Sequence, residues 1–268
     1  MKNMVITSFL LSAAICIGTA AFSAPPLRHG VGRGRSPVTT QEAAEVKKAN
    51  EKSKRRIAPY LTDEGSSGRL TWKEYTVNPK AKGEATLLVV FGGRDSVKDG
   101  RGEAKIPVAI EKAISHASLL PRSGRLIVLV PDMMVGESRR GRGGRETPVS
   151  EGMPKLVRSR MEKHGVKAER TFATGFSMGG GLVYSLLNDD PTLFARALVV
   201  VASGNPNATK DIRAEILDYH GADDDYIPAV RVKAFAEAVN AKTPGRMRLE
   251  TLDKTGHAES ETAAYSKN

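Results

Sequence analysis

The sequence predicts an α/β protein whose central sheet is mostly parallel and is covered by helices on both faces. First, short apolar stretches that suit buried strands alternate with helical stretches along most of the chain. Second, one predicted strand runs into a tight glycine-flanked turn and then a helix, at residues 171–181. Third, 268 residues with a hydrophobic content of 40% are enough for a large domain with a buried core. We therefore expect one folded domain, over residues 66–268.

Residues 1–24 are predicted to be a secretory signal peptide. Lys2 supplies a positive charge, residues 5–21 are almost wholly apolar or small, and small residues continue to Ala24. The alternative, an uncleaved membrane anchor, is less favoured because this apolar stretch is short for a membrane span. Cys16, the only cysteine, lies in this segment, so we expect a mature protein without disulfides. The predicted location is therefore secreted or periplasmic.

Residues 25–65 are expected to form a basic and flexible arm. Prolines and glycines between Pro25 and Pro37 break regular structure, and a charged helix is expected from Thr40 to Arg56. Residues 25–56 contain nine lysines and arginines against three glutamates. The resulting surplus of positive charge is about half of the formal net charge of +11. The arm is either a solvated spacer or a contact with an anionic envelope or polysaccharide. Nucleic acid is the least favoured partner, because the sequence has no zinc-finger, RNP or basic-aromatic motif.

Within the domain, each strand is predicted from its composition. Residues 69–77 alternate in polarity, and residues 85–91 form a nearly continuous apolar run that is typical of a buried parallel strand. The predicted strands, in order, cover residues 69–77, 85–91, 125–130, 170–174, 195–202, 214–220 and 247–252. The predicted helices cover residues 104–120, residues 149–164, the stretch after Ser177, residues 228–241 and a weak final segment after Ala258. In such a sheet, ligands bind at the carboxyl ends of the strands.

The turn between the fourth predicted strand and its helix reads Gly175-Phe176-Ser177-Met178-Gly179. This G-x-S-x-G pattern is typical of a nucleophile elbow, in which a strained turn lifts a serine hydroxyl clear of the sheet. The flanking glycines avoid side-chain collisions in so tight a turn. The N–H groups at the start of the helix suit negative charge that develops on a substrate. The pattern also arises by chance in glycine-rich loops, but the strand before it and the apolar helix after it favour the functional interpretation.

A serine hydroxyl needs a base to become a good nucleophile, and histidine suits this role near neutral pH. In folds with a nucleophile elbow, the chain order is serine, acid, histidine. Only His220 and His257 follow Ser177, and only His257 also follows an acidic turn. We therefore predict His257 as the base and interpret His220 as structural. The acid is expected among three consecutive aspartates of that turn, Asp223, Asp224 and Asp225. Spacing alone does not choose among them.

With these residues, the chain resembles the α/β-hydrolase superfamily, and within it the secreted esterases similar to polyhydroxybutyrate depolymerases and feruloyl esterases. The resemblance covers residues 85–257, and its most specific stretch runs from Gly165 to Gly180. The other matching stretches are Leu87 to Gly93, Asp190 to Ala195, His220 to Pro228, and Gly256-His257. In that family the acid stands four residues after the histidine of a His-Gly pair and four before a proline. The resemblance thus implies Asp224 as the acid, with Asp225 as the second choice.

The resemblance also implies an oxyanion hole made by backbone N–H groups, one from Met178 and one from Gly93 or Arg94. The family usually has His-Gly-Gly after the corresponding strand, whereas this chain has Phe91-Gly92-Gly93. The two glycines still allow the backbone to approach a substrate oxygen closely. Loss of one donor would raise the reaction barrier by about 3 kcal/mol, so Phe91 is the departure from the family pattern that matters most.

Together these residues predict a serine esterase that acts through an acyl-enzyme on a small-molecule or polymer-linked ester, aromatic esters included. Arg94, Arg139 and Arg140 lie in loops expected near the pocket mouth, where they are either ordinary surface charge or contacts for an anionic substrate. The alternatives are a serine peptidase of the same superfamily and a non-catalytic envelope-binding protein, for which Phe91 is the main argument. The sequence has no metal-ligand spacing and no nucleotide-binding loop, so no cofactor is expected.

Overall fold

The fold is described from a computed structural model, which covers residues 40–67, 70–96, 104–117, 124–132 and 152–267. The predicted signal peptide and residues 25–39 of the predicted arm lie outside these described residues. Among the helices within the described ranges, none is both long enough and apolar enough to cross a membrane.

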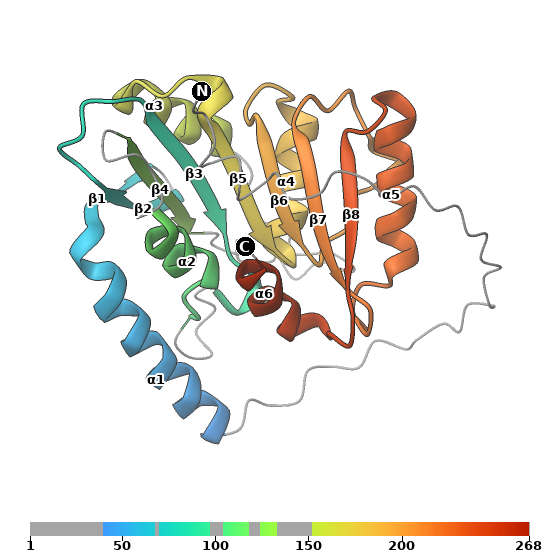
Figure 1. The fold of residues 1–268 in the computed structure, drawn as a ribbon, viewed down its shortest axis with the longest axis horizontal. Coiled ribbons are helices and arrows are strands. Elements are labelled where there is room, and N and C mark those ends of the chain that lie inside the picture. Colours follow the sequence, from blue (N-terminus) through green and yellow to red (C-terminus); the bar gives the residue numbers. More distant parts are fainter. Residues whose placement is uncertain (1–39, 68–69, 97–103, 118–123, 133–151, 268) are drawn as a thin grey trace, which may run out of the picture.

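Eight strands form one sheet in the order β1-β2-β4-β3-β5-β6-β7-β8. The pairs β1–β2 and β2–β4 are antiparallel, and all the other neighbouring strands are parallel. The strands are β1 (Leu61–Ser67), β2 (Leu70–Val77), β3 (Ala85–Phe91), β4 (Arg125–Asp132), β5 (Thr171–Phe176), β6 (Arg196–Val200), β7 (Glu215–Gly221) and β8 (Met247–Leu252). In Figure 1 the arrowheads of β3, β5 and β7 point toward the same edge of the sheet, where a parallel sheet is expected to bind its ligand.

Helices cover both faces of this sheet (Figure 1). One apolar cluster joins the strands to helices α3, α4 and α5, and a second cluster joins them to α1, α2 and α6. The helices are α1 (Thr40–Ile57), α2 (Val108–His116), α3 (Met153–His164), α4 (Met178–Asp189), α5 (Ala229–Lys242) and α6 (His257–Ser266). Short 3₁₀ helices are η1 (Ala58–Tyr60), η2 (Arg94–Ser96), η4 (Ala168–Arg170) and η5 (Pro206–Ala208). The predicted α/β fold with a mostly parallel, doubly covered sheet is confirmed.

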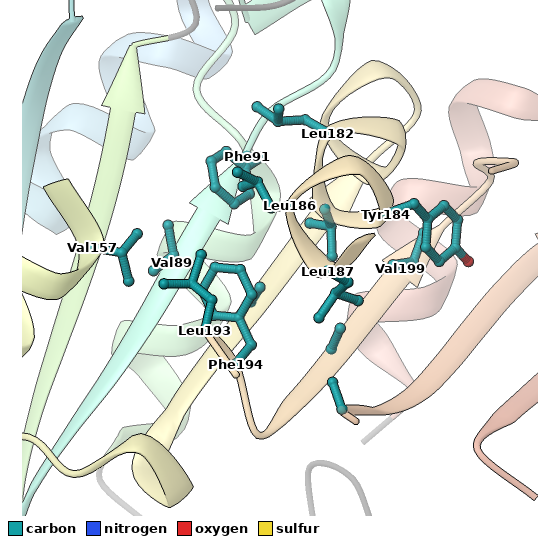
Figure 2. Close-up of a cluster of buried hydrophobic side chains, with 14 of the residues drawn as sticks. Val89, Phe91, Val157, Leu182, Tyr184, Leu186, Leu187, Leu193, Phe194 and Val199 are labelled. Atoms are coloured by element: carbon teal, nitrogen blue, oxygen red, sulfur yellow. The ribbon is translucent and has the colours of Figure 1, made fainter. Parts of the chain in front are cut away.

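The strands supply both clusters because successive side chains point to opposite faces of a sheet. On β3, Val89 and Phe91 belong to the first cluster and Val90 to the second. Phe91 of β3 and Leu186 of α4 belong to the first cluster, which Figure 2 shows, and both are fully buried. Burial of one such leucine side chain contributes about 2 kcal/mol. This packing fixes α4 against β3 at the end of the sheet where the predicted serine lies.

The sheet begins earlier than the sequence predicts. Strand β1 pairs with β2 from Leu61 onward, so residues 61–65 belong to the sheet and not to a flexible arm. Every side chain of β1 is exposed or half-buried, and the strand therefore lacks the apolar alternation that sequence analysis detects. The helix expected over Thr40–Arg56 is present as α1. Helix α2 starts at Val108 rather than at residue 104, because Pro107 precedes it and disfavours helix at the residue before.

Candidate active site

Ser177 lies at the junction between strand β5 and helix α4. Its backbone has φ 52° and ψ −114°, a conformation that is uncommon for any residue other than glycine. Its N–H donates to the Val200 carbonyl at 2.9 Å, and its carbonyl accepts from the Gly181 N–H at 3.0 Å. The strained strand–turn–helix unit expected from the sequence is therefore present. Such strain costs about 1–3 kcal/mol and occurs mainly where function requires it.

Two glycines make this turn sterically possible. A Cβ atom on Gly175 would lie 2.5 Å from the backbone of Gly179, and one on Gly179 would lie 2.4 Å from the carbonyl oxygens of Phe91 and Gly92. Any side chain at either position would therefore push the helix away from the sheet. Because both residues are glycines, α4 can begin directly beside the end of β3.

The side chains of Ser177, His257 and Asp224 form a chain of two hydrogen bonds. Ser177 Oγ lies 2.8 Å from His257 Nε2, and His257 Nδ1 lies 2.8 Å from Asp224 Oδ2. His257 is the first residue of α6, and Asp224 lies in the turn between β7 and α5. Three segments that are distant in sequence thus meet where the parallel strands end. The arrangement allows a proton to pass from the serine hydroxyl to the imidazole, with the carboxylate on the opposite ring nitrogen.

The turn after β7 holds Asp224 in a single orientation. Its second carboxylate oxygen, Oδ1, accepts hydrogen bonds from the backbone N–H groups of Tyr226 at 2.8 Å and Ile227 at 2.9 Å. The Asp224 side chain is fully buried, whereas Asp223 and Asp225 are exposed. The structure therefore brings Asp224, and not Asp225, to His257.

His220 supports the same turn from the end of β7. Its Nε2–H donates to the Ile227 carbonyl at 2.8 Å, and Nε2 lies 3.9 Å from Asp224 Oδ2. Burial lowers the pKa of His220 below its usual value, which favours the neutral imidazole. These contacts agree with the interpretation of His220 as a structural residue, because it bonds to the acid turn and not to Ser177.

Helix α6, which carries His257, is tied to the domain by a bridge that sequence analysis missed. Glu261 is almost completely buried, pairs with Lys105 Nζ at 2.6 Å and accepts the Val108 N–H at 3.2 Å. Lys105 Nζ also lies 3.6 Å from the carboxylate of Asp95 in η2. The four-residue spacing of His257 and Glu261 puts both on one face of a helix. Nothing in the sequence, however, points to a partner 156 residues away.

The predicted oxyanion-hole residues lie beside the elbow. Met178 is the first residue of α4, so its N–H has no acceptor within the helix. A Cβ atom on Gly93 would lie 2.7 Å from the Phe176 ring, so Gly93 is packed against the residue that precedes Ser177. The Phe91 ring is buried in the cluster with α4 and therefore points into the core. Donation of hydrogen bonds to a substrate by Met178 and Gly93 stays a prediction.

The predicted substrate-binding arginines lie only partly within the described residues. Arg94 begins η2 directly after Gly93 and is exposed. Arg139 and Arg140 lie outside the part of the chain that the structure describes. Contact between these arginines and a substrate stays a prediction.

Two aromatic rings flank His257, and sequence analysis singled out neither of them. The ring centroids of Phe176 and Tyr226 lie 5.4 Å and 5.1 Å from that of the imidazole. Their positions in the sequence are a signal that could have been used, since Phe176 precedes Ser177 and Tyr226 follows Asp224 by two residues. The exposure of Tyr226 could not have been read from sequence.

Comparisons with known proteins identify the fold. Residues 148–265, somewhat less than half of the chain, match a family model described as phospholipase/carboxylesterase. No curated protein matches the chain in sequence. Among solved structures, a thermostable esterase is 18% identical with a TM-score of 0.60, and the alignment covers 79% of this chain and 61% of that chain. This chain thus spans less than two thirds of that esterase.

Esterase 2 of Thermogutta terrifontis is similar over most of its own length. Its apo form is 16% identical with a TM-score of 0.52, and the alignment covers 77% of this chain and 89% of that chain. The same esterase phosphorylated by paraoxon is 15% identical with a TM-score of 0.54, covering 78% of this chain and 90% of that chain. At such low identity these likenesses establish the fold, while the family model matches the segment that holds Ser177, Asp224 and His257. The described residues therefore have the fold of these esterases.

Proposed function

We propose that this protein hydrolyses carboxylic esters through a covalent acyl-enzyme. Ser177 is the nucleophile, His257 is the general base and acid, and Asp224 orients the imidazole. The observation that carries the proposal is the chain of two 2.8 Å hydrogen bonds from Ser177 Oγ through His257 to Asp224. The positive φ of Ser177 supports it, because residues held in such conformations cluster at active sites.

In the first half of the reaction, His257 Nε2 takes the proton from Ser177 as Oγ attacks the ester carbonyl carbon. The bond to the alcohol oxygen then breaks, and Nε2 gives its proton to that leaving oxygen. In the second half, Nε2 takes a proton from the water that attacks the acyl-enzyme and returns it to Ser177 as the acid leaves. Asp224 stays ionised, accepts the Nδ1–H hydrogen bond throughout and stabilises the imidazolium.

The negative charge on the substrate oxygen is assigned to two backbone donors, the N–H groups of Met178 and Gly93. Support for this assignment comes from the place of Met178 at the positive end of α4. The contact between Gly93 and Phe176 adds support, because it keeps the second donor beside the elbow. Backbone donors suit this role since they need no reorganisation during the reaction.

Replacement of the nucleophile tests the proposal. Ser177→Ala should lower kcat for p-nitrophenyl acetate by at least about 10⁴-fold, because no hydroxyl remains to form the acyl-enzyme. Ser185→Ala, which changes an exposed serine on the same helix, serves as the matched control and should keep the wild-type rate. Thermal unfolding should be little changed in both variants. Retained turnover in Ser177→Ala would remove the proposal.

Whether the protein prefers esters or amides as substrates is tested by a separate comparison. A serine peptidase would use the same side chains, so the wild-type protein should be offered an ester and the aminoacyl amide with the same acyl group. Ester preference in kcat/KM that exceeds the intrinsic reactivity difference supports the esterase proposal. Comparable turnover of both substrates would instead support the peptidase.

The proposal includes export and a role for the basic arm. Export rests on the signal-like residues 1–24, and intact mass of the protein recovered outside the cytoplasm should show their removal. Contact of the arm with an anionic envelope or polysaccharide rests on the exposed cations of α1, such as Lys47, Lys48 and Lys52. Recovery of the protein with residues 1–24 still attached would argue against export.

A further inference from the structure

Large apolar side chains are seldom exposed in the described part of the chain, and one of the exposed ones, Tyr226, lies against His257. Within the described part of the chain, the exposed large hydrophobic side chains are Leu61 at 41%, Tyr226 at 71% and Val230 at 56%. Tyr226 and Val230 are four residues apart, at the end of the turn that carries Asp224 and the start of α5. Scattered apolar side chains need no explanation, but an exposed aromatic ring that contacts a proposed catalytic residue points to a ligand contact.

The Tyr226 ring is exposed although its backbone is fixed. The Tyr226 N–H donates to Asp224 Oδ1 at 2.8 Å, so a large movement of this residue would cost the carboxylate one of its hydrogen bonds. The ring rests on His257, with centroids 5.1 Å apart and planes at 50°. The remainder of the ring faces solvent. A rigid aromatic surface thus stands next to the imidazole, at little further entropic cost for ligand binding.

The chemistry of the proposed reaction indicates which half of an ester would meet this ring. His257 Nε2 must deliver its proton to the leaving oxygen, so the alcohol lies on the histidine side of the serine. The carbonyl oxygen lies instead toward Met178 and Gly93, and Gly93 packs against Phe176, the other ring beside His257. Tyr226 contacts the imidazole that delivers this proton, so we expect its ring to meet the alcohol half of the ester.

We propose that Tyr226 is the main contact of a binding site for the leaving alcohol, and that this site prefers an uncharged alcohol bearing an aromatic ring. The inference rests on the proposed ester hydrolysis and adds to it the chemical class of the alcohol. An exposed tyrosine ring favours another ring in stacked or edge-to-face contact. The exposed carboxylates of Asp223 and Asp225 on the same turn disfavour an alcohol that carries negative charge.

The test compares 2-phenylethyl acetate with butyl acetate in the wild-type protein and three variants. Both esters give the same acyl-enzyme and release primary alcohols, so the ratio of their kcat/KM values reports binding of the leaving group. Wild type should favour the phenylethyl ester, and Tyr226→Ala should reduce the ratio about fivefold. Tyr226→Phe keeps the ring and should keep the ratio. Leu61→Ala, an exposed apolar residue on β1, should leave both rates as in wild type.

Three outcomes would overturn the inference while leaving the proposed ester hydrolysis intact. The first is a wild-type protein that turns over both esters without preference. The second is an equal loss for both esters in Tyr226→Ala, which would mean that the ring only positions His257. The third is a loss confined to esters with the ring on the acyl side, tested with methyl phenylacetate against methyl pentanoate. Failure of the proposed function is distinct, since wild type would then turn over none of these esters.

Discussion

At the residue scale, Asp224 is the side chain whose surroundings are most specialised. It is fully buried, and its two oxygens accept hydrogen bonds from His257 Nδ1 and from the backbone of the next turn. A carboxylate that accepts this set of hydrogen bonds is held in one rotamer. The neighbouring carboxylates of Asp223 and Asp225 are exposed to water. Residues one position apart therefore have different expected roles.

Amide substitution separates the roles of these aspartates. Asp224→Asn should lower kcat for p-nitrophenyl acetate by about 10⁴-fold, because a neutral amide can neither enforce the productive imidazole tautomer nor stabilise the imidazolium. Asp225→Asn removes an equal charge one residue away and should change kcat by less than about threefold. Initial rates at saturating ester measure both effects. Similar losses in the two variants would contradict the assignment of Asp224.

His220 gives the acid turn a stability that depends on pH. Burial lowers its pKa in the folded protein below the value of about 6.5 expected for the unfolded chain. Below that value the unfolded chain binds more protons than the folded protein, so this stability is present above pH 6.5 and is lost as the pH falls. His220→Gln, which keeps a donor for the Ile227 carbonyl, should therefore lose less thermal stability than wild type between about pH 7.5 and about pH 5. An equal fall in melting temperature over this pH range in both proteins would contradict this prediction.

At the scale of elements, helix α6 must be held in place for His257 to reach Ser177. The bridge from Glu261 to Lys105 and the Val108 N–H ties it to α2. A second tie is the 2.7 Å hydrogen bond between the buried hydroxyls of Tyr265 and Thr174. Thr174 is in β5, the strand that leads to the serine. Helix α6 is thus hydrogen-bonded to strand β5, which leads to the turn at Ser177.

Replacement of Lys105 should show how much the buried carboxylate of Glu261 destabilises the fold when its cation is missing. Lys105→Met leaves that carboxylate without its cation and should lower the free energy of unfolding by about 2 kcal/mol, less than for a fully buried pair because Lys105 is partly exposed. Lys233→Met breaks an exposed pair with Glu237 and should cost less than about 0.5 kcal/mol. Urea unfolding measures both. In a Glu261→Gln background the effect of Lys105→Met should largely disappear, and full additivity would contradict the bridge.

At the scale of the whole molecule, the formal net charge of +11 should draw anionic esters to the protein. Phenyl succinate monoester carries a negative charge on its acyl half, whereas phenyl butyrate has the same leaving group and no charge. The kcat/KM ratio of the anionic to the neutral ester should fall about threefold between low salt and about 0.5 M NaCl, because salt screens exposed charges. Equal salt dependence of the two esters would show that the charge does not act on the substrate.

Local signals made most of the fold predictable from sequence. The apolar runs at residues 85–91 and 247–252 match β3 and β8 to the residue, and the glycine spacing around Ser177 predicts its strained turn. Strand β1 was not predictable, because its exposed side chains carry no pattern. The local spacing did not determine which of three aspartates is the acid, because only the tertiary fold brings one of them to His257. The exposure of Tyr226 and the Lys105–Glu261 pair likewise depend on how distant segments pack.

The central claim is that one serine of this chain is made nucleophilic by His257, and covalent labelling tests it most directly. The protein should be treated with a fluorophosphonate and its peptides mapped by mass spectrometry. We expect a single adduct on Ser177 in the wild-type protein and none in a folded His257→Ala variant, since the hydroxyl then has no base. An adduct on another residue, undiminished labelling without His257, or an unlabelled wild-type protein would contradict the claim.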